Sequence, residues 1–170
     1  MTQPNDSLRV RGRVWLFGED VNTDDMYPGF AMRLPTAEAA QYVFNASRPG
    51  WPALVRPGDI IVGGHRFGLG SARPVAVLLK ELGVSCILAE EFNSLFLRNI
   101  INYGLPILAV PGISTVFAEG DTVEVDIEAA QVRHVSGEPH LTGKPYPTLV
   151  LDLLRHGGVE GSLRSRGYIE

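Results

Sequence analysis

Hydrophobic and polar positions along the chain predict short strands that alternate with helices. Strand-like apolar patterns occupy residues 10–17, 60–62, 86–89 and 107–110. A helix is expected to begin at Pro74 and to end before Gly83, because proline is tolerated at the first helical position. A second helix is expected from Asn93 to Tyr103, closed by Gly104. Strand, helix, strand, helix, strand is typical of a parallel α/β core.

Outside this core the pattern predicts smaller pieces. Thr36 is the expected N-cap of one further helix, and residues 161–170 are expected to form a flexible tail. The other predicted pieces are a polar loop at 18–25, that helix at 37–45, a hairpin of 122–127 with 131–135, and a last helix at 149–156.

Length and composition limit the possible functions. The 170 residues, 45% of them hydrophobic, suit one domain over 1–170. With 15 Lys+Arg against 19 Asp+Glu, no global basic field attracts nucleic acid or an anionic membrane. No apolar run approaches the roughly 18 residues of a membrane span, so we expect a soluble, cytoplasmic protein. The one cysteine, Cys86, is expected to be a reduced core thiol, which excludes a disulfide framework and a cysteine-based metal site in this chain.

The glycine-rich stretch 63–74 is the first candidate site. Its glycines let the backbone approach a ligand, a helix start follows, and Arg73 can grip a carboxylate with two N–H groups. We therefore expect an anion site. Ser71 in its centre is either an N-cap or a base that works as an alkoxide, and spacing alone favours the cap.

The same stretch permits a rival interpretation, dinucleotide binding. Gly68 and Gly70 lie between a strand and a helix, and Glu90 follows at the distance expected of a ribose-binding acid. Arg73 stands where the third glycine of that motif belongs, and the chain supplies only one such half. Dinucleotide binding is therefore the second choice.

Two further polar segments are predicted to be structural when taken alone. Adjacent acids in residues 22–29 are typical of a solvated turn. In the helix after Asn93, the polar side chains Arg98, Asn99 and Asn102 are of the kind that fix packing.

Together the three segments resemble the small subunits of isopropylmalate dehydratase and homoaconitase, which correspond to the swivelling domain of aconitase. The motifs occur in that family's order and spacing over nearly the whole chain. The resemblance implies a single α/β swivelling β/β/α domain, with a mixed sheet flanked by helices. It implies that Ser71 is the catalytic base and not the N-cap that spacing alone favours. It also implies that Asp24 is an active-site acid. Arg73 would bind a substrate carboxylate, with Gly70 and Ala72 beside it.

The resemblance also implies cofactor and partner. The family carries a [4Fe–4S] cluster in the large subunit, whose open iron acts on the leaving hydroxyl while the serine takes a proton from the neighbouring carbon. This chain would then bind no metal itself and would form a heterodimer with a cluster-bearing subunit. The expected activity is that of a hydro-lyase on a small 2-hydroxy di- or tricarboxylic acid, as in leucine biosynthesis.

Several residues depart from the family pattern. The family has Gly-Ser-Ser-Arg-Glu followed by His or Gln, whereas this chain has Ala72 and Pro74 at the third and fifth positions. Asn22 replaces the first aspartate of Asp-Thr-Asp. Arg33 lies in the specificity loop, where homoaconitases carry an arginine, and faces either an added carboxylate or solvent. These changes leave the substrate open and keep a third alternative, a binding module that kept the fold without catalysis.

Overall fold

Strand β1 (Arg9–Leu16) lies at the centre of a seven-stranded mixed sheet in the computed structural model, which describes residues 7–170. The strand order is β4-β3-β2-β1-β5-β6-β7. On one side of β1 the parallel strands are β2 (Ile60–Gly63), β3 (Cys86–Ala89) and β4 (Ile107–Ala109). On the other side the antiparallel strands are β5 (Thr122–Asp126), β6 (Gln131–His134) and β7 (His140–Thr142). β1 therefore joins a parallel half to an antiparallel half.

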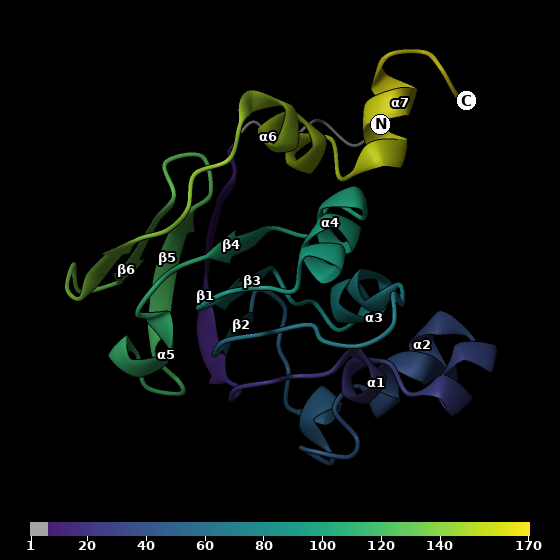
Figure 1. The fold of residues 1–170 in the computed structure, drawn as a ribbon, viewed down its shortest axis with the longest axis horizontal. Coiled ribbons are helices and arrows are strands. Elements are labelled where there is room, and N and C mark those ends of the chain that lie inside the picture. The colour runs from purple at the N-terminus through teal and green to yellow at the C-terminus, as the bar shows by residue number, and fades with distance from the viewer. Residues whose placement is uncertain (1–6) are drawn as a thin grey trace.

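Helices flank the sheet mainly on the side of its parallel half (Figure 1). The α-helices are α1 (Thr23–Met26), α2 (Thr36–Ala39), α3 (Val75–Glu81), α4 (Ser94–Asn102), α5 (Ile113–Val116), α6 (Thr148–Arg155) and α7 (Val159–Ser165). Three 3₁₀ turns complete the set: η1 (Gly29–Arg33), η2 (Ala40–Tyr42) and η3 (Trp51–Ala53). Within residues 7–170, no helix combines the length and the apolar character that crossing a membrane requires.

The parallel and the antiparallel strands differ in their pattern of buried residues. All four residues of β2 and of β3 are buried, and α5 contacts both strands. β5 instead alternates, with Val123 and Val125 in the core and the polar side chains between them outside.

The sheet is curled, so that the segment after one edge strand, β7, forms a hydrogen bond with the other edge strand, β4. The backbone N–H of Lys144 donates to the carbonyl oxygen of Ala109 at 2.8 Å, and that of Gly143 donates to Ala130 at 2.7 Å. A Cβ at Gly143 would lie 2.8 Å from the Ala109 oxygen, so the close approach requires glycine. The chain after β7 thereby covers the exposed edge of β4.

Most predicted elements agree with the structure, including the mixed sheet flanked by helices and the β5–β6 hairpin. The prediction for Thr36 is wrong: Pro35 is the N-cap, and the helix breaks into α2 and η2. Pro74 is the N-cap of α3 and not its first helical residue. The predicted loop 18–25 contains the start of α1, because the Asn22 side chain accepts a hydrogen bond from the Asp24 N–H at 2.8 Å. These errors lie at the ends of helices, where a single capping residue determines at which residue the helix begins.

Five further short elements were not predicted from the sequence: η1, η3, α5, β7 and α7. α7 occupies part of the segment for which a flexible tail is expected. That segment has regular structure at its start, and its mobility stays a prediction.

Candidate active site

The loops that follow β1 and β2 lie side by side and carry the predicted site residues. The Thr23 N–H donates to the Leu69 carbonyl oxygen at 2.7 Å, and the Gly68 N–H donates to Val21 at 2.8 Å. On the opposite side, the Asn93 N–H donates to the carbonyl oxygen of Phe67 at 2.9 Å. The glycine-rich loop is thus held between the Asn22-Thr23-Asp24 motif and the start of α4, at the carboxyl ends of parallel strands, where ligands of α/β sheets usually bind.

Two glycines permit this close packing. Gly68 has φ +88°, and a Cβ there would lie 2.1 Å from Cγ of Phe96. Gly70 has φ +100°, and a Cβ there would lie 2.6 Å from Oδ1 of Asn22. Both positions therefore exclude other residues by backbone conformation and by space.

Ser71 is exposed and precedes α3 by four residues. α3 has no side-chain cap, so the capping role that spacing alone favours for Ser71 is wrong. The backbone carbonyl oxygen of Ser71 accepts a hydrogen bond from Thr23 Oγ1 at 2.7 Å, which fixes the loop to a buried threonine. The Ser71 hydroxyl makes no hydrogen bond within residues 7–170, and the residue is exposed and therefore accessible to a ligand.

The backbone around Ser71 offers a row of free donors. The N–H groups of residues 70–73 donate to no acceptor among residues 7–170. Successive unpaired N–H groups next to left-handed glycines form the kind of concavity that binds anions. Ser71, Ala72 and Arg73 line a small depression together with Thr23, Gly68 and Gly70.

Arg73 supplies the positive charge of this depression. Its Nη2 lies 2.7 Å from Asp24 Oδ1, and its Nη1 donates to the carbonyl oxygen of Tyr27 at 2.6 Å. The Arg73 side chain is 16% exposed and that of Asp24 is 60% exposed, so the arginine is held in place while the acid faces solvent. The structure therefore brings two of the predicted residues, Asp24 and Arg73, into direct contact.

Arg33 lies apart from these groups. It is the exposed last residue of η1, and its side chain forms no ion pair or hydrogen bond with any residue from 7 to 170. The first residue of η1, Gly29, is nevertheless close to the site, because a Cβ there would lie 4.0 Å from Arg73 Nη1. η1 thus begins beside the depression and carries Arg33 away from its lining.

Three residues of α4 line the same depression and were not predicted as site residues: Leu95, Phe96 and Asn99. Leu95 is 49% exposed, an unusual position for leucine at a helix start. The Oδ1 atom of Asn99 is buried without a hydrogen-bond partner in the part of the chain that the structure describes. The sequence predicts the helix but contains no signal for its contact with the loop.

Glu90, the acid that dinucleotide binding would need, already forms hydrogen bonds within the chain. The Glu90 carboxylate accepts hydrogen bonds from Ser114 Oγ at 2.6 Å, from Ser114 N–H at 2.9 Å and from Gly112 N–H at 2.7 Å. Burial raises the pKa of Glu90, but these hydrogen bonds outweigh it and hold the pKa below its usual value. Glu90 therefore anchors the start of α5 and is not free to bind a ribose hydroxyl.

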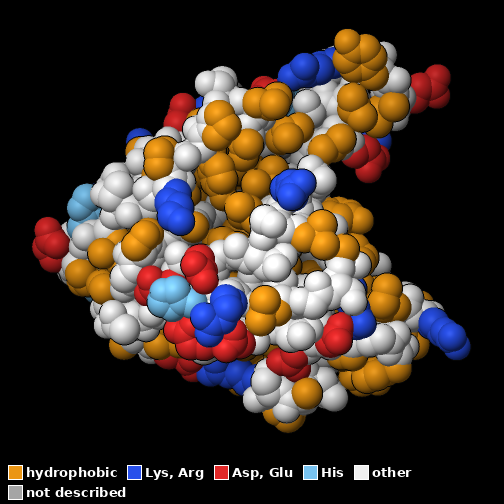
Figure 2. All heavy atoms as spheres, viewed as in Figure 1, with side chains coloured by type: hydrophobic (Ala, Val, Ile, Leu, Met, Phe, Trp, Pro, Cys, Tyr) orange, Lys and Arg blue, Asp and Glu red, His pale blue; other side chains and the backbone are white. Residues whose placement is uncertain are grey.

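The face in Figure 2 has one cluster of charged groups and one area rich in apolar groups. Acidic and basic side chains gather toward the lower left, whereas apolar side chains dominate near α6 and α7. Exposed hydrophobic residues there include Leu149, Val159, Leu163 and Tyr168.

The part of the chain that the structure describes groups no side chains into a metal site. Among residues 7–170, no three His, Cys, Asp or Glu side chains are grouped as a metal ion would require. Cys86 is fully buried in β3, and burial raises the pKa of its thiol, which opposes formation of the thiolate that binds metals.

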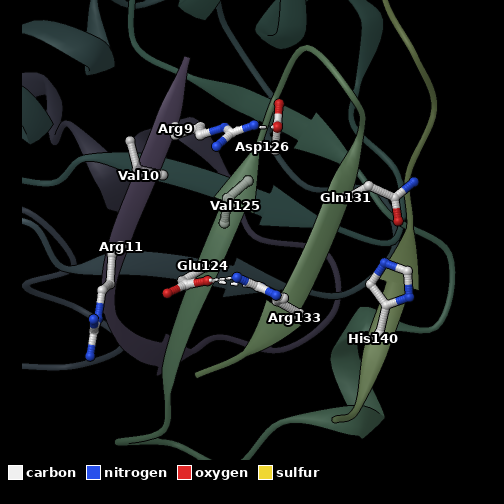
Figure 3. A pocket seen from close by; sticks show the side chains of 9 residues that line it. All are labelled: Arg9, Val10, Arg11, Glu124, Val125, Asp126, Gln131, Arg133 and His140. Atoms are coloured by element: carbon white, nitrogen blue, oxygen red, sulfur yellow. Dashed lines mark hydrogen bonds and ion pairs between the residues drawn. The ribbon is translucent and has the colours of Figure 1, made fainter. Parts of the chain in front are cut away.

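A larger hollow lies on the outer face of the antiparallel half, and Figure 3 shows its polar side chains. Arg9 stands opposite Asp126 in the β1–β5 register and lies 3.0 Å from it. Glu124 stands opposite Arg133 in the β5–β6 register, 2.6 Å away. These two pairs neutralise each other across strands, whereas Arg11 and His140, which also line the hollow, form no ion pair within residues 7–170.

Comparison with known proteins places these motifs in context. Residues 22–111 match the family model described as the aconitase C-terminal domain. The chain is 40% identical to the isopropylmalate/citramalate isomerase small subunit of Methanocaldococcus jannaschii, over 92% of this chain and 95% of that protein. It is 41% identical to the methanogen homoaconitase small subunit of Methanothermobacter thermautotrophicus, over 88% of each. The crystal structure of 3-isopropylmalate dehydratase from M. jannaschii has a TM-score of 0.86 and 29% identity, over 94% of this chain and 96% of that one.

Proposed function

The chain belongs to the family of the aconitase C-terminal domain, and on this premise we propose that it is the small subunit of a two-subunit hydro-lyase. The proposed reaction is dehydration or isomerisation of a 2-hydroxy di- or tricarboxylic acid. It takes place at a face shared with a larger subunit, because the relatives named above are themselves small subunits. Its proposed location is the cytoplasm.

One observation carries the proposal: Ser71 lies in a row of unpaired N–H groups beside Arg73. A serine hydroxyl is a weak base unless its oxyanion is stabilised, and backbone N–H donors with a nearby guanidinium provide that stabilisation. The same donors also suit a substrate carboxylate.

In the proposed reaction, the Ser71 alkoxide accepts the proton from the carbon next to the one that bears the hydroxyl, and so becomes a neutral hydroxyl. The electron pair of that C–H bond forms the double bond as the C–O bond of the adjacent carbon breaks. The hydroxyl departs as hydroxide on the side away from this chain and takes up a proton to become water. Arg73 binds a substrate carboxylate through its free N–H groups and so fixes the carbon near the serine. Gly70 and Ala72 contribute backbone N–H groups to the same site.

Asp24 is assigned to this site as its acid. Its ion pair with Arg73 orients the guanidinium before substrate arrives. Arg73 lines the depression, and Asp24, bound to it, remains 60% exposed and able to meet a ligand.

The [4Fe–4S] cluster is assigned to the large subunit. The residues described here do not fit such a cluster, since the one thiol is buried and no group of metal-binding side chains is present among them. We assign no step of the reaction on this chain to the cluster.

The arginines of the site favour a substrate with carboxylate groups, but they do not determine which di- or tricarboxylic acid it is. Arg73 accounts for one carboxylate. Arg33 lies outside the lining of the depression, so it would contact only an additional carboxylate of an acid long enough to extend beyond that depression toward the end of η1. Replacement of Arg33 by leucine should then weaken a tricarboxylic substrate more than an alkyl-substituted dicarboxylic one.

Reconstitution with the large subunit tests the proposal. The two chains are produced together, loaded with iron and sulfide without oxygen, and assayed with 3-isopropylmalate, homoaconitate, citraconate and methyl-substituted malates. We expect turnover of at least one acid by the pair and none by either chain alone. Saturable binding of an acid without turnover would instead support the non-catalytic binding module.

A further inference from the structure

Asn99 of α4 carries an unused hydrogen-bond acceptor inside the candidate site. Its Oδ1 is shielded from solvent and receives no hydrogen bond from any residue between 7 and 170. A buried acceptor without a donor destabilises a fold, because it has given up its hydrogen bonds to water. If position 99 served packing alone, an apolar side chain of similar size would destabilise the fold less than asparagine does. We therefore expect Asn99 Oδ1 to receive a hydrogen bond from a donor.

The missing donors lie in the same depression. Asn99, Ser71 and Arg73 all line it, and the N–H groups of residues 70–73 lack acceptors within the described residues. One helical turn before Asn99, the ring of Phe96 packs against Gly68, where a Cβ would lie 2.1 Å from Cγ. α4 is thereby fixed against the beginning of the loop, and Asn99 shares the depression with the part that carries Ser71.

We propose that Asn99 is a positioning residue for Ser71: in the assembled enzyme its Oδ1 accepts a hydrogen bond from an N–H group of residues 70–73. This inference rests on the proposed function, because it concerns the same site. The contact forms when the large subunit covers the depression and excludes water from it. An amide suits this role because it is neutral. A carboxylate would bind the N–H groups more strongly but would oppose negative charge on Ser71 Oγ.

Backbone hydrogen exchange tests the contact directly. Exchange at residues 70–73 is measured in the full chain, alone and assembled with the large subunit, for the native sequence, Asn99→Leu and Asn102→Leu. Asn102 is an exposed residue of the same helix outside the depression and serves as the matched control. We expect equal exchange in the three free chains. In the complex, Asn99→Leu should exchange about tenfold faster than the other two. Equal protection in all three complexes overturns the proposal.

Kinetics of the assembled enzyme separate positioning from general stability. With the acid that the pair turns over, Asn99→Leu should lower kcat about tenfold or more while KM changes little. Asn99→Asp keeps an acceptor but adds a negative charge, which raises the pKa of the base, so its activity should rise at higher pH than in the native enzyme. A merely structural asparagine would leave the pH profile unshifted in Asn99→Asp.

Failure of this inference is distinguishable from failure of the proposed function. Full turnover in Asn99→Leu together with lost turnover in Ser71→Ala overturns the role of Asn99 alone. Full turnover in Ser71→Ala overturns the assignment of the base itself. The exchange measurement needs no substrate, so it decides for or against the Asn99 contact even if none of the tested acids is turned over.

Discussion

Ser71 and Arg73 differ in how firmly the structure holds them. The Ser71 hydroxyl is exposed and unbonded within the described residues, whereas Arg73 is mostly buried and bound to Asp24 and to the Tyr27 carbonyl. A group that must exchange a proton needs a free oxygen, and a group that orients a carboxylate needs a fixed guanidinium. The two residues therefore have the environments that their proposed roles require.

Ser71→Ala is expected to remove catalysis without harming the fold. Turnover of the assembled enzyme should fall by about two orders of magnitude or more, the scale for loss of a positioned proton acceptor. The melting temperature should change little, because the Ser71 side chain makes no hydrogen bond within residues 7–170. Ser94→Ala, at an exposed serine that opens α4, is the matched control and should leave both quantities unchanged. An enzyme that melts early but keeps its turnover would contradict the assignment.

Arg73→Lys should act mainly on substrate binding. A single ammonium cannot hold Asp24, the Tyr27 carbonyl and a substrate carboxylate as the planar guanidinium can. KM should rise about tenfold or more, the effect of losing a hydrogen bond to a charged group, with a smaller effect on kcat. Steady-state kinetics decide this, with Arg98→Lys on the exposed face of α4 as control. A loss confined to kcat would show that the arginine acts only in the transition state.

At the scale of elements, Asp59 joins β1 to the turn before β2. Asp59 is 3% exposed, and its carboxylate accepts hydrogen bonds from Arg13 Nη2 and Trp15 Nε1, each at 2.7 Å, and from the Arg56 N–H at 2.9 Å. Burial alone would raise the pKa of Asp59, but the hydrogen bonds from Arg13, Trp15 and Arg56 outweigh it and lower the pKa below 3.8.

This network predicts a pH-dependent stability. Because the folded pKa is lowered, the contribution of the Asp59 carboxylate is complete above its unfolded pKa, near 3.8, and is lost as the pH falls through the lower folded value. Asp59→Asn should reduce the free energy of unfolding by about 1.5–3 kcal/mol at pH 7. The difference from the native chain should shrink below about pH 4.

Urea unfolding at several pH values measures that difference. Asp126→Asn is the control, because the Arg9 side chain that pairs with Asp126 is 76% exposed, and such surface pairs contribute only about 0–1 kcal/mol. A difference for Asp59→Asn that stays constant down to pH 3 would show that its hydrogen bonds do not depend on its charge.

At the scale of the whole molecule, the site is open on one side. Ser71, Ala72 and Asp24 face solvent, and an apolar side chain, Leu95, is exposed next to them. Proton transfer from carbon requires a site that excludes water, which this chain does not build by itself. The open depression thus agrees with a partner that completes it.

The isolated chain is expected to fold, to be inactive and to bind no iron–sulfur cluster. Reconstitution with iron and sulfide without oxygen, followed by visible absorption, measures cluster binding. Cys86→Ala is the matched variant: if the only thiol is structural, the variant assembled with the large subunit should keep the same cluster absorption as the native pair. A stoichiometric cluster on the isolated chain would contradict the two-subunit assignment.

The sequence by itself determined the order of the elements and the identity of the loop. Apolar runs bounded by turn residues predict β2, β3 and β4, and the glycines at 68 and 70 predict a tight loop between strand and helix. These features depend on neighbours within a few residues, so local periodicity and turn chemistry reveal them.

Only the tertiary structure decided which distant groups meet. Asp24 and Arg73 are 49 positions apart, and nothing between them encodes the 2.7 Å contact. Glu90 has the spacing of a ribose ligand, yet its carboxylate is engaged by Gly112 and Ser114. Asn99 has the pattern of a packing residue, yet its Oδ1 lacks a partner. Such contacts depend on how curled strands bring separate loops to one edge of the sheet, and side-chain periodicity carries no information about that geometry.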